Sequence, residues 1–312
     1  MEIYSSDNEQ IPKHTEFTAS SMGSIAFEAI EQVDDGIVFG VTSRGIYIKT
    51  SSRWIVFISH EPHHGPLTIN VPDARNVKSF INNKMRVHFA SGKIHIPDAA
   101  ITVNTNNSFV WHPKPPPAPA LPDAASRERM IAAAEEIISR GSEEGLSVLL
   151  PQLLGTTHHM DFDGKNIPSR FLSILDLANE TGELISQKFI VDLLGIGPGL
   201  TPSGDDFVMG LLLAVNRWKS EYLSQHNLDL FNREIMAAAY QQTTTLSANL
   251  IECAAQGLAD QRLIDALDWL VSGSETSMQS IDALLTWGSS SGSDIFVGFV
   301  VALSSRNSTE QA

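Results

Sequence analysis

The sequence has few of the features that mark secreted, membrane-spanning or nucleic-acid-binding proteins. Cysteine occurs once, at Cys253, which excludes an intrachain disulfide and favours a reducing compartment. Lys and Arg number 21 against 36 Asp and Glu, and the net charge of −15 disfavours nucleic acid and anionic membranes as partners. The apolar run 207–215 is far shorter than the roughly 20 residues that span a bilayer. The first residues lack a secretory signal, so we expect a cytoplasmic protein.

The first third of the chain reads as short strands. Of the 312 residues, 42% are hydrophobic and 18% charged, which is enough for a sizeable core and fits two domains. The runs on both sides of Ser91-Gly92, VHFA and KIHI, alternate between apolar and polar residues, which predicts a hairpin with its turn at these two residues. We expect a small antiparallel sheet or barrel built from the runs 36–49 (turning at 43–45), 53–59, 67–71, 87–96, 101–103 and 109–111.

A proline-rich segment separates this part from a helical one. Residues 112–123 read HPKPPPAPALPD, a composition typical of a stiff, extended spacer. The sequence therefore predicts an α+β protein with a β-rich domain at 1–112, a linker at 113–123 and a predominantly α-helical domain at 124–312. Helical periodicity places helices at 126–140, 143–154, 169–180, 183–194, 203–222, 228–256, 260–271, 277–287 and 291–303.

An internal repeat lies within the helical part. Residues 203–215 read SGDDFVMGLLLAV and residues 291–303 read SGSDIFVGFVVAL, so equivalent positions differ by 88. Each copy begins with S-x-x-D, which predicts that the serine accepts a hydrogen bond from the aspartate amide as in a capping box. Each then continues apolar on nearly all sides, with a glycine that permits close helix contact. We expect two equivalent buried helices with converging N-termini.

The first copy has an unusual entrance, GIGPGLTPSGDD at 195–206. Glycines and prolines before a helix N-terminus can direct several amides at one point, the arrangement that holds phosphate or carboxylate. Thr201 and Ser203 add hydroxyls, while Asp205 and Asp206 are suited to orient a substrate amide, take a proton or bind Mg²⁺. The Lys-Ser/Thr ending of a nucleotide P-loop is absent. The alternative interpretation is a tight turn followed by a capped core helix.

Other polar segments allow two interpretations each. Residues 241–249, QQTTTLSAN, either turn Thr244, Thr245 and Ser247 toward the same pocket or mark a kink or new helix start. HEPHH at 60–64 fits a turn better than an incomplete Zn²⁺ site, and HHMDFDG at 158–164 fits a solvated loop. Cys253 fits the core better than a nucleophile. The candidate cations for an anion are Arg170, Lys188 and Arg217.

Three segments, GIGPGLTPSGDDFVMGLL, TTTLSANLIECAAQG and WGSSSGSDIFVGF, resemble the AllH-like family, roughly over residues 20–303. Its named members are a subunit of oxamate carbamoyltransferase in anaerobic allantoin breakdown, a branch of purine nitrogen catabolism. The resemblance implies a β-rich part followed by a helical part, transfer of a carbamoyl group between oxalurate and phosphate to give oxamate and carbamoyl phosphate, and partner subunits. The Ser-Thr-Arg-Thr phosphate motif of ordinary transcarbamoylases is absent.

The resemblance and the motifs together give one set of candidate site residues. Asp205, Asp206 and Asp294 are the catalytic candidates. The substrate-binding candidates are Gly197, Gly199, Thr201, Ser203, Gly204, Thr244, Thr245, Ser247, Ser291 and Gly292. We expect no cofactor other than Mg²⁺, which Asp205 and Asp206 would bind if the chain were instead a different enzyme acting on a phosphorylated metabolite. A non-catalytic module that binds a small anion is the third hypothesis.

Overall fold

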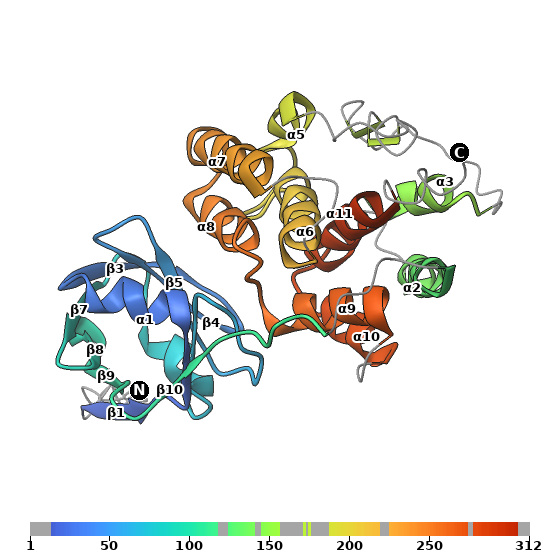
Figure 1. The fold of residues 1–312 in the computed structure, drawn as a ribbon. Helices are drawn as coiled ribbons and strands as arrows, with labels where there is room; N and C mark the ends of the chain where they lie inside the picture. Colours follow the sequence, from blue (N-terminus) through green and yellow to red (C-terminus); the bar gives the residue numbers. More distant parts are fainter. Residues whose placement is uncertain are drawn as a thin grey trace, which may run out of the picture. The chain divides into compact units, whose positions relative to one another are not determined.

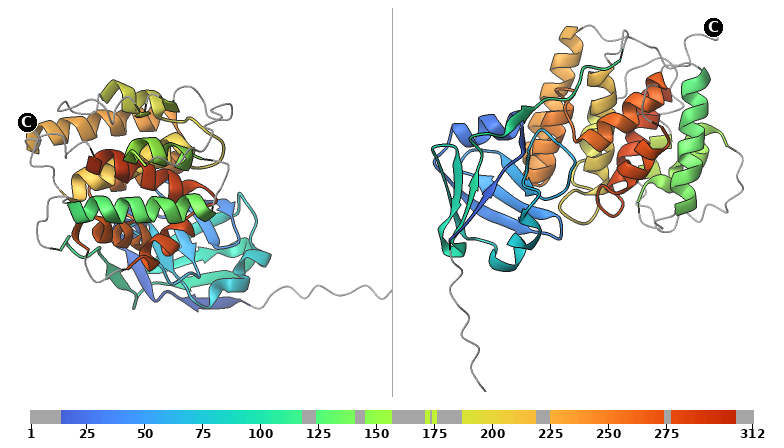
Figure 2. Two further views of the ribbon diagram at one scale, coloured as in Figure 1. Left: turned by 90° about the vertical axis from the view of Figure 1, so that its right-hand side faces the viewer. Right: turned by 90° about the horizontal axis from the view of Figure 1, so that it is seen from below.

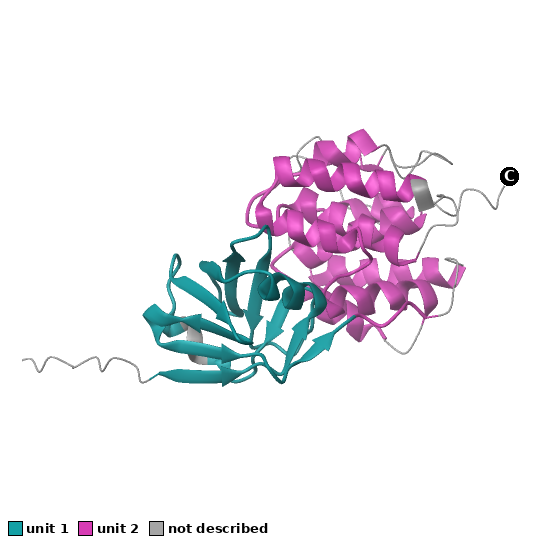
Figure 3. Cartoon of the chain, turned by 60° about the vertical axis from the view of Figure 1, so that its left-hand side comes forward, with its two compact units in different colours: residues 1–112 teal, residues 113–312 magenta. Residues whose placement is uncertain are grey.

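The computed structural model describes residues 14–117, 124–140, 145–156, 171–172, 174–175, 187–218, 225–273 and 277–304. The chain divides into two compact units, residues 1–112 and 113–312, which Figure 3 shows in different colours. The first unit is a curled sheet and the second is helical, so the protein combines the two kinds of structure as an α+β fold (Figure 1). No helix in these ranges is long and apolar enough to cross a membrane.

The first unit contains one sheet of ten strands. Their bounds are β1 (Thr15–Thr18), β2 (Ser21–Gly23), β3 (Asp35–Val41), β4 (Gly45–Thr50), β5 (Ile55–Ser59), β6 (Thr68–Asn70), β7 (Arg86–Ala90), β8 (Lys93–Ile96), β9 (Ile101–Asn104) and β10 (Phe109–Trp111). They follow the order β1-β9-β8-β7-β3-β4-β5-β6-β2-β10. The sheet is mixed, because β1 pairs with β9, β10 with β2, and β5 with β6 in parallel. The prediction of a purely antiparallel sheet is wrong at these three pairs.

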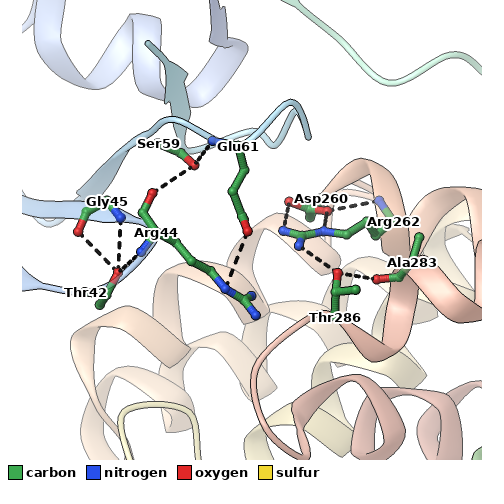
Figure 4. A network of polar contacts seen from close by, with 9 residues as sticks. All are labelled: Thr42, Arg44, Gly45, Ser59, Glu61, Asp260, Arg262, Ala283 and Thr286. Carbon is green, nitrogen blue, oxygen red and sulfur yellow. Dashed lines mark hydrogen bonds and ion pairs between the residues drawn. The ribbon is translucent and has the colours of Figure 1, made fainter. Parts of the chain in front are cut away.

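Local turn chemistry sets the register of the antiparallel part. The β7–β8 hairpin turns at Ser91 and Gly92, whose φ angles are 53° and 68°, as a tight two-residue hairpin turn requires. In the turn before β4, the Thr42 hydroxyl oxygen accepts the amides of Arg44 and Gly45, each at 3.2 Å (Figure 4). The predicted turns at both places are confirmed.

The HEPHH segment connects β5 and β6. The Asn70 side-chain amide donates to the backbone carbonyl oxygens of Glu61 and His63, both at 2.9 Å, and so fastens the connection to β6. The His64 ring lies 3.0 Å from the Ser21 hydroxyl. In the part of the chain that the structure describes, no three His, Cys, Asp or Glu side chains are grouped to hold a metal. The interpretation of this segment as a turn is supported.

One helix, α1 (Ser24–Glu31), interrupts the strands and was not predicted. Its Ala26, Ala29 and Ile30 pack into the apolar core formed by one face of the sheet. Alternate residues of the strands fill the rest of that core, for example Ile46 and Ile48 of β4, which are 2% and 0% exposed. The unit also has two short 3₁₀ helices, η1 (Ala74–Phe80) and η2 (Pro97–Ala99).

The second unit is a group of helices packed around two central ones. The helices are α2 (Ala124–Arg140), α3 (Leu150–Leu154), α5 (Gln187–Leu193), α6 (Ser203–Arg217), α7 (Gln225–Gln242), α8 (Thr245–Ala254), α9 (Gln261–Ser272), α10 (Gln279–Leu285) and α11 (Ser291–Ser304), with a 3₁₀ turn, η3 (Ser147–Leu149), before α3. The central pair is α6 and α11, which share the largest contact in the unit (Figures 1 and 2). The helices α5 and α8 contact α6, while α2, α3 and α10 contact α11.

The helix predictions differ from the structure mainly at their ends. The segment predicted as one helix over 228–256 is two helices, because Thr244 caps a new one by accepting the Ser247 amide at 3.1 Å. The helix expected to run to 222 ends at Arg217. Residues 113–117 form neither helix nor strand. Residues 118–123, almost all of 169–180, and the loop 158–164 lie outside the described residues.

Candidate functional site

The two repeat helices, α6 and α11, pack against each other through equivalent glycines. A Cβ atom on Gly210 would collide with the carbonyl oxygen of Ile295, and one on Gly298 would collide with that of Phe207. Positions 207 and 295 are themselves equivalent in the repeat, so the contact is reciprocal. Both helices are buried along almost their whole length. This close, symmetric packing fixes the two helix starts beside each other.

Polar side chains at the start of each repeat helix contact the start of the other. The Ser203 hydroxyl of α6 hydrogen-bonds the Asp294 carboxyl of α11, and the Ser291 hydroxyl of α11 hydrogen-bonds the Asp206 carboxyl of α6. The hydroxyls of Thr201 and Ser291 lie 3.2 Å apart. The convergence of the two N-termini that the repeat predicted is therefore confirmed. Their helix dipoles both favour negative charge at this point.

The capping boxes that the sequence predicted are not formed. The N-cap of α6 is Pro202, whose carbonyl oxygen accepts the Asp206 amide at 3.1 Å, and Ser203 is the first helical residue. In the second copy the Ser290 carbonyl oxygen accepts the Asp294 amide at 3.0 Å. Because the helical backbone already satisfies these amides, the serine side chains are released to contact the partner helix.

The glycine-rich loop before α6 leaves several backbone amides without acceptors. Gly195, Gly197 and Gly199 have φ angles of 74°, 120° and 95°, a backbone region that other residues rarely adopt. Within the loop, the Ile196 carbonyl oxygen accepts the Gly204 amide at 2.9 Å. Among the residues that the structure describes, five loop amides have no hydrogen-bond acceptor: those of Gly197, Gly199, Leu200, Thr201 and Ser203. The loop is exposed from Gly197 to Leu200.

Asp205 holds the base of this loop. Its Oδ1 accepts the Gly195 amide at 2.7 Å, and its Oδ2 accepts the Thr243 hydroxyl. Burial raises the pKa of Asp205, and these hydrogen bonds oppose the rise. Thr243 was not among the predicted site residues, although it is the first threonine of the TTT run. A catalytic role for Asp205 stays a prediction.

The predicted hydroxyl donors of α8 contact the loop backbone. The Thr244 and Ser247 hydroxyls both donate to the Leu200 carbonyl oxygen, at 2.7 and 3.2 Å. Thr244 thus serves both as the N-cap of α8 and as a support for the loop. Thr245 is half-buried at the start of α8, and its hydroxyl has no hydrogen-bond partner within the described ranges. The structure brings Thr244 and Ser247 to the loop, but as supports of its backbone.

Beneath the loop lie two carboxyls that are not fully satisfied. Asp206 and Asp294 are 1% and 0% exposed, and the Oδ2 atom of each is buried with no hydrogen-bond partner among the described residues. Burial raises the pKa of Asp206 well above its ordinary value, and repulsion from Asp294 and Asp205 raises it further, against the Ser291 and Thr201 hydroxyls. Burial raises the pKa of Asp294 to about 6, against hydrogen bonds from Leu146, Ser203 and Ser290. Asp206 is thereby favoured as a neutral acid, whereas Asp294 ionises near pH 6.

The second helix start rests on contacts that the sequence did not reveal. The Asp294 Oδ1 atom accepts the Leu146 amide at 2.6 Å, and no motif marks that residue. The Arg262 guanidinium pairs with the buried Asp260 carboxylate at 2.8 Å and donates to the Thr286 hydroxyl at 3.2 Å (Figure 4). It also lies over the Trp287 ring. The sequence could have indicated this ion pair, because Arg262 follows two residues after Asp260, which caps α9.

Two glycines of the predicted site have packing roles. Gly204 lies in the first turn of α6, where a Cβ atom would collide with the Leu193 carbonyl oxygen. Gly292 lies in the first turn of α11, where a Cβ atom would collide with the Leu284 carbonyl oxygen. The Gly292 amide donates to the Trp287 carbonyl oxygen at 2.9 Å, so it is not available to a ligand.

Neither of the two cation candidates that the structure describes has a contact with the loop. Arg217 lies at the opposite end of α6, buried and paired with Asp268 through Nη2 to Oδ2 at 2.6 Å. Lys188 is exposed on α5, and Arg170 lies outside the described residues. Cys253 is fully buried, and burial raises the pKa of its thiol, which supports the interpretation as a core residue. In the part of the chain that the structure describes, the hydrogen-bond donors at the loop are therefore amides and hydroxyls.

Fold and site together define an α+β protein in which a duplicated helix pair brings a glycine-rich loop above two buried carboxyls. Residues 193–303 match the family model described as oxamate carbamoyltransferase subunit AllH, and the resemblance is confirmed over these residues. The match includes the loop, α6, α8 and α11, and it is shorter than the span of 20–303 expected from the motifs. No solved structure matches the chain significantly.

Proposed function

We propose that the chain is a subunit of a carbamoyltransferase of the oxamate type, acting with partner subunits in allantoin nitrogen catabolism. The reaction moves a carbamoyl group between phosphate and an amide nitrogen, with oxalurate or a similar ureido acid on one side and oxamate on the other. The observation that carries the proposal is the set of unclaimed loop amides above Asp206 and Asp294, inside the region that matches the family model.

The loop is suited to hold the anionic part of the substrate. Amides at a helix N-terminus bind phosphate and carboxylate through hydrogen bonds and the helix dipole. The amides of Gly197 to Ser203 precede α6 directly, and the second helix start adds its dipole at the same point. A tetrahedral intermediate at the carbamoyl carbon carries a negative oxygen, which the same kind of donor stabilises.

The transfer also requires a proton to move. When oxalurate reacts with hydrogen phosphate, the bond between the carbamoyl carbon and the amide nitrogen breaks, and a bond to a phosphate oxygen forms. The proton of hydrogen phosphate goes to the departing nitrogen, which completes the amide of oxamate. A carboxyl with a raised pKa is suited to relay such a proton near neutral pH. Asp206 and Asp294 meet that requirement better than Asp205, whose oxygens hold the loop.

The direct test is phosphate-dependent cleavage of oxalurate by the purified chain, alone and reconstituted with its partner subunits. We expect carbamoyl phosphate to form only when phosphate is present, and to form fastest in the reconstituted complex. A folded chain that yields no product in either preparation would refute the proposal.

A glycine variant tests whether the loop is the binding element. Gly197→Ala would place a Cβ atom 2.8 Å from the Ser203 amide nitrogen and cover it. We expect at least ~10-fold weaker phosphate binding, since one charge-assisted hydrogen bond is lost and the loop is strained. Gly155→Ala is the matched control, because Gly155 also has a positive φ, 64°, but caps α3. Equal phosphate affinity of the two variants would contradict the assignment.

A non-catalytic binding module is the second candidate, favoured by the depth of the carboxyls. Asp206 and Asp294 are almost fully buried, as expected of groups that shape a site without reacting. In that case Asp206→Asn would weaken phosphate binding yet leave the turnover of a partner subunit unchanged at saturating substrate. Loss of turnover with phosphate binding intact would exclude the module.

A further inference from the structure

We infer that Asp206 and Asp294 form a two-carboxyl clamp that recognises an uncharged carboxamide or ureido head of the ligand, while the loop amides take its anionic end. This inference rests on the proposed function and assigns the two aspartates a role in specificity. It follows from the position of the two carboxyls, from their free oxygens and from the charges around them.

The two carboxyls lie at one place, although they come from helices distant in sequence. Ser203 and Ser291 exchange hydrogen bonds with the carboxyl of the opposite helix, and the Thr201 hydroxyl hydrogen-bonds Asp206 and lies 3.2 Å from that of Ser291. Repulsion between Asp206 and Asp294 is strong enough to contribute to the raised pKa of Asp206. In each aspartate, the Oδ2 atom is buried and has no hydrogen-bond partner within the described part of the chain.

Free buried oxygens are costly unless a partner is supplied. A buried polar atom without a hydrogen bond destabilises the fold, and a ligand that satisfies it gains the corresponding affinity. Here two such atoms belong to equivalent positions of the repeat, 206 and 294, so neither is an isolated packing defect. A protonated carboxyl can donate to the C=O group of an amide and an ionised one can accept from its N–H group, so a pair with one proton between them matches one amide.

The charge of the surroundings indicates which part of a ligand reaches this depth. Among the described residues, no lysine or arginine appears among the causes of the raised pKa of Asp206 or Asp294, so these residues supply no charge to compensate a second anion beside the two carboxyls. The unclaimed amides lie in the exposed loop instead, and the half-buried Thr201 and Ser203 connect the loop to the carboxyls. A ligand with a charged end at the loop and a neutral amide end at the carboxyls fits this arrangement, whereas a ligand with two charged ends does not.

Three small ligands of nearly the same size distinguish the possibilities. Oxamate has a carboxylate and a carboxamide; pyruvate replaces the amide NH₂ by CH₃; oxalate replaces the amide by a second carboxylate. Dissociation constants are measured by titration calorimetry with the full chain, and phosphate is used as a competitor. We expect oxamate to bind at least ~10-fold more tightly than pyruvate or oxalate, because sites that pair with an N–H group strongly reject analogues that lack it.

Variants assign the preference to the aspartates. In Asp206→Ala and Asp294→Ala we expect the ratio of the pyruvate and oxamate dissociation constants to fall toward one. Asp206→Asn should keep most of the preference, since an amide also offers a donor and an acceptor. The exposed Asp192 of α5 provides the control Asp192→Ala. Far-UV circular dichroism checks that each variant is folded.

The outcomes separate this inference from the proposed function. Pyruvate or oxalate binding as tightly as oxamate to the unmodified chain overturns the clamp, whatever the variants do. An unchanged preference in folded Asp206→Ala and Asp294→Ala overturns it as well. If phosphate binds and competes but oxamate gains nothing from its amide, the clamp fails and the loop remains an anion site. If phosphate does not bind either, the proposed function fails.

Discussion

Ionisation of Asp294 should make the stability of the helical unit depend on pH. The side chain is fully buried, and its Oδ1 accepts the Leu146 amide at 2.6 Å. Burial raises its pKa from 3.8 to about 6, and the hydrogen bonds from Leu146, Ser203 and Ser290 only partly offset that rise. Asp294→Asn keeps an oxygen for the Leu146 amide but removes the titration of this group. It also removes the repulsion that helps to raise the pKa of Asp206, which favours the variant in the same direction as the pH rises.

The sign and size follow from proton linkage. A raised pKa means that the folded chain holds this proton more tightly than the unfolded chain does. The free energy of unfolding therefore carries no penalty from this group below about pH 3.8, falls as the pH rises, and carries the full penalty above about pH 7. A shift of about 2 pKa units corresponds to about 3 kcal/mol. Roughly 2 kcal/mol of this develops between about pH 4.5 and about pH 7.5.

Urea unfolding followed by circular dichroism near 222 nm reports on the helical unit. As the pH rises from about 4.5 to about 7.5, the free energy of unfolding of Asp294→Asn should increase by about 2 kcal/mol relative to that of the unmodified chain. Asp192→Asn, an exposed substitution on α5, should show no comparable shift. A difference that does not vary with pH, or that favours the variant most at low pH, would refute the reasoning.

Three further substitutions test the scaffold and the loop. Gly298→Val should lower the free energy of unfolding by about 3 kcal/mol in urea melts, because its side chain would meet the Phe207 carbonyl oxygen, whereas an unchanged melt would contradict the packing. Arg262→Ala should cost about 3 kcal/mol or more, since it leaves the Asp260 carboxylate buried without its cation, and the neutral double variant with Asp260→Asn should recover part of the loss. Thr244→Ala should cost about 1 kcal/mol through the lost cap and weaken phosphate binding through the loop, and a change in melting alone would exclude the second effect.

Most of the fold was predictable wherever local chemistry decides it. The turn at Ser91-Gly92 was found because its residue types suit positive φ angles, and the strands beside it alternate as a half-buried sheet should. The parallel pairing of β1 with β9 was not predictable, because it joins residues distant in sequence and no local pattern encodes it. The helix α1 was missed for a similar reason: it is only eight residues long and is stabilised by packing of Ala26, Ala29 and Ile30 on the sheet.

The meeting of the two helix starts was predictable from the sequence, but the side-chain bonds there were not. The glycine-rich entrance and the repeat correctly indicated two helix starts that meet. The local rule for S-x-x-D made Ser203 the cap of its own helix, but Pro202 is the N-cap and its carbonyl oxygen accepts the Asp206 amide. The Ser203 hydroxyl is therefore available to Asp294, which close packing at Gly210 and Gly298 brings near. Local motifs describe a segment as if it were isolated, and a tertiary partner overrides them.

The two copies of the repeat differ around their helix starts. Position 205 is aspartate in the first copy, and the equivalent position 293 is serine. Asp205 reaches beyond its helix to hold the Gly195 amide at 2.7 Å, whereas the Ser293 hydroxyl donates to the nearby Ser290 carbonyl oxygen at 2.6 Å. A symmetric pair of helices supplies two equivalent carboxyls, but the segments that lead into the helices differ throughout: GIGPGLTP at 195–202 precedes α6, and ALLTWGSS at 283–290 precedes α11. Asp205 adds to this difference, because it fastens the exposed, amide-rich loop over one helix start. Such an asymmetric entrance suits the proposed ligand with two different ends.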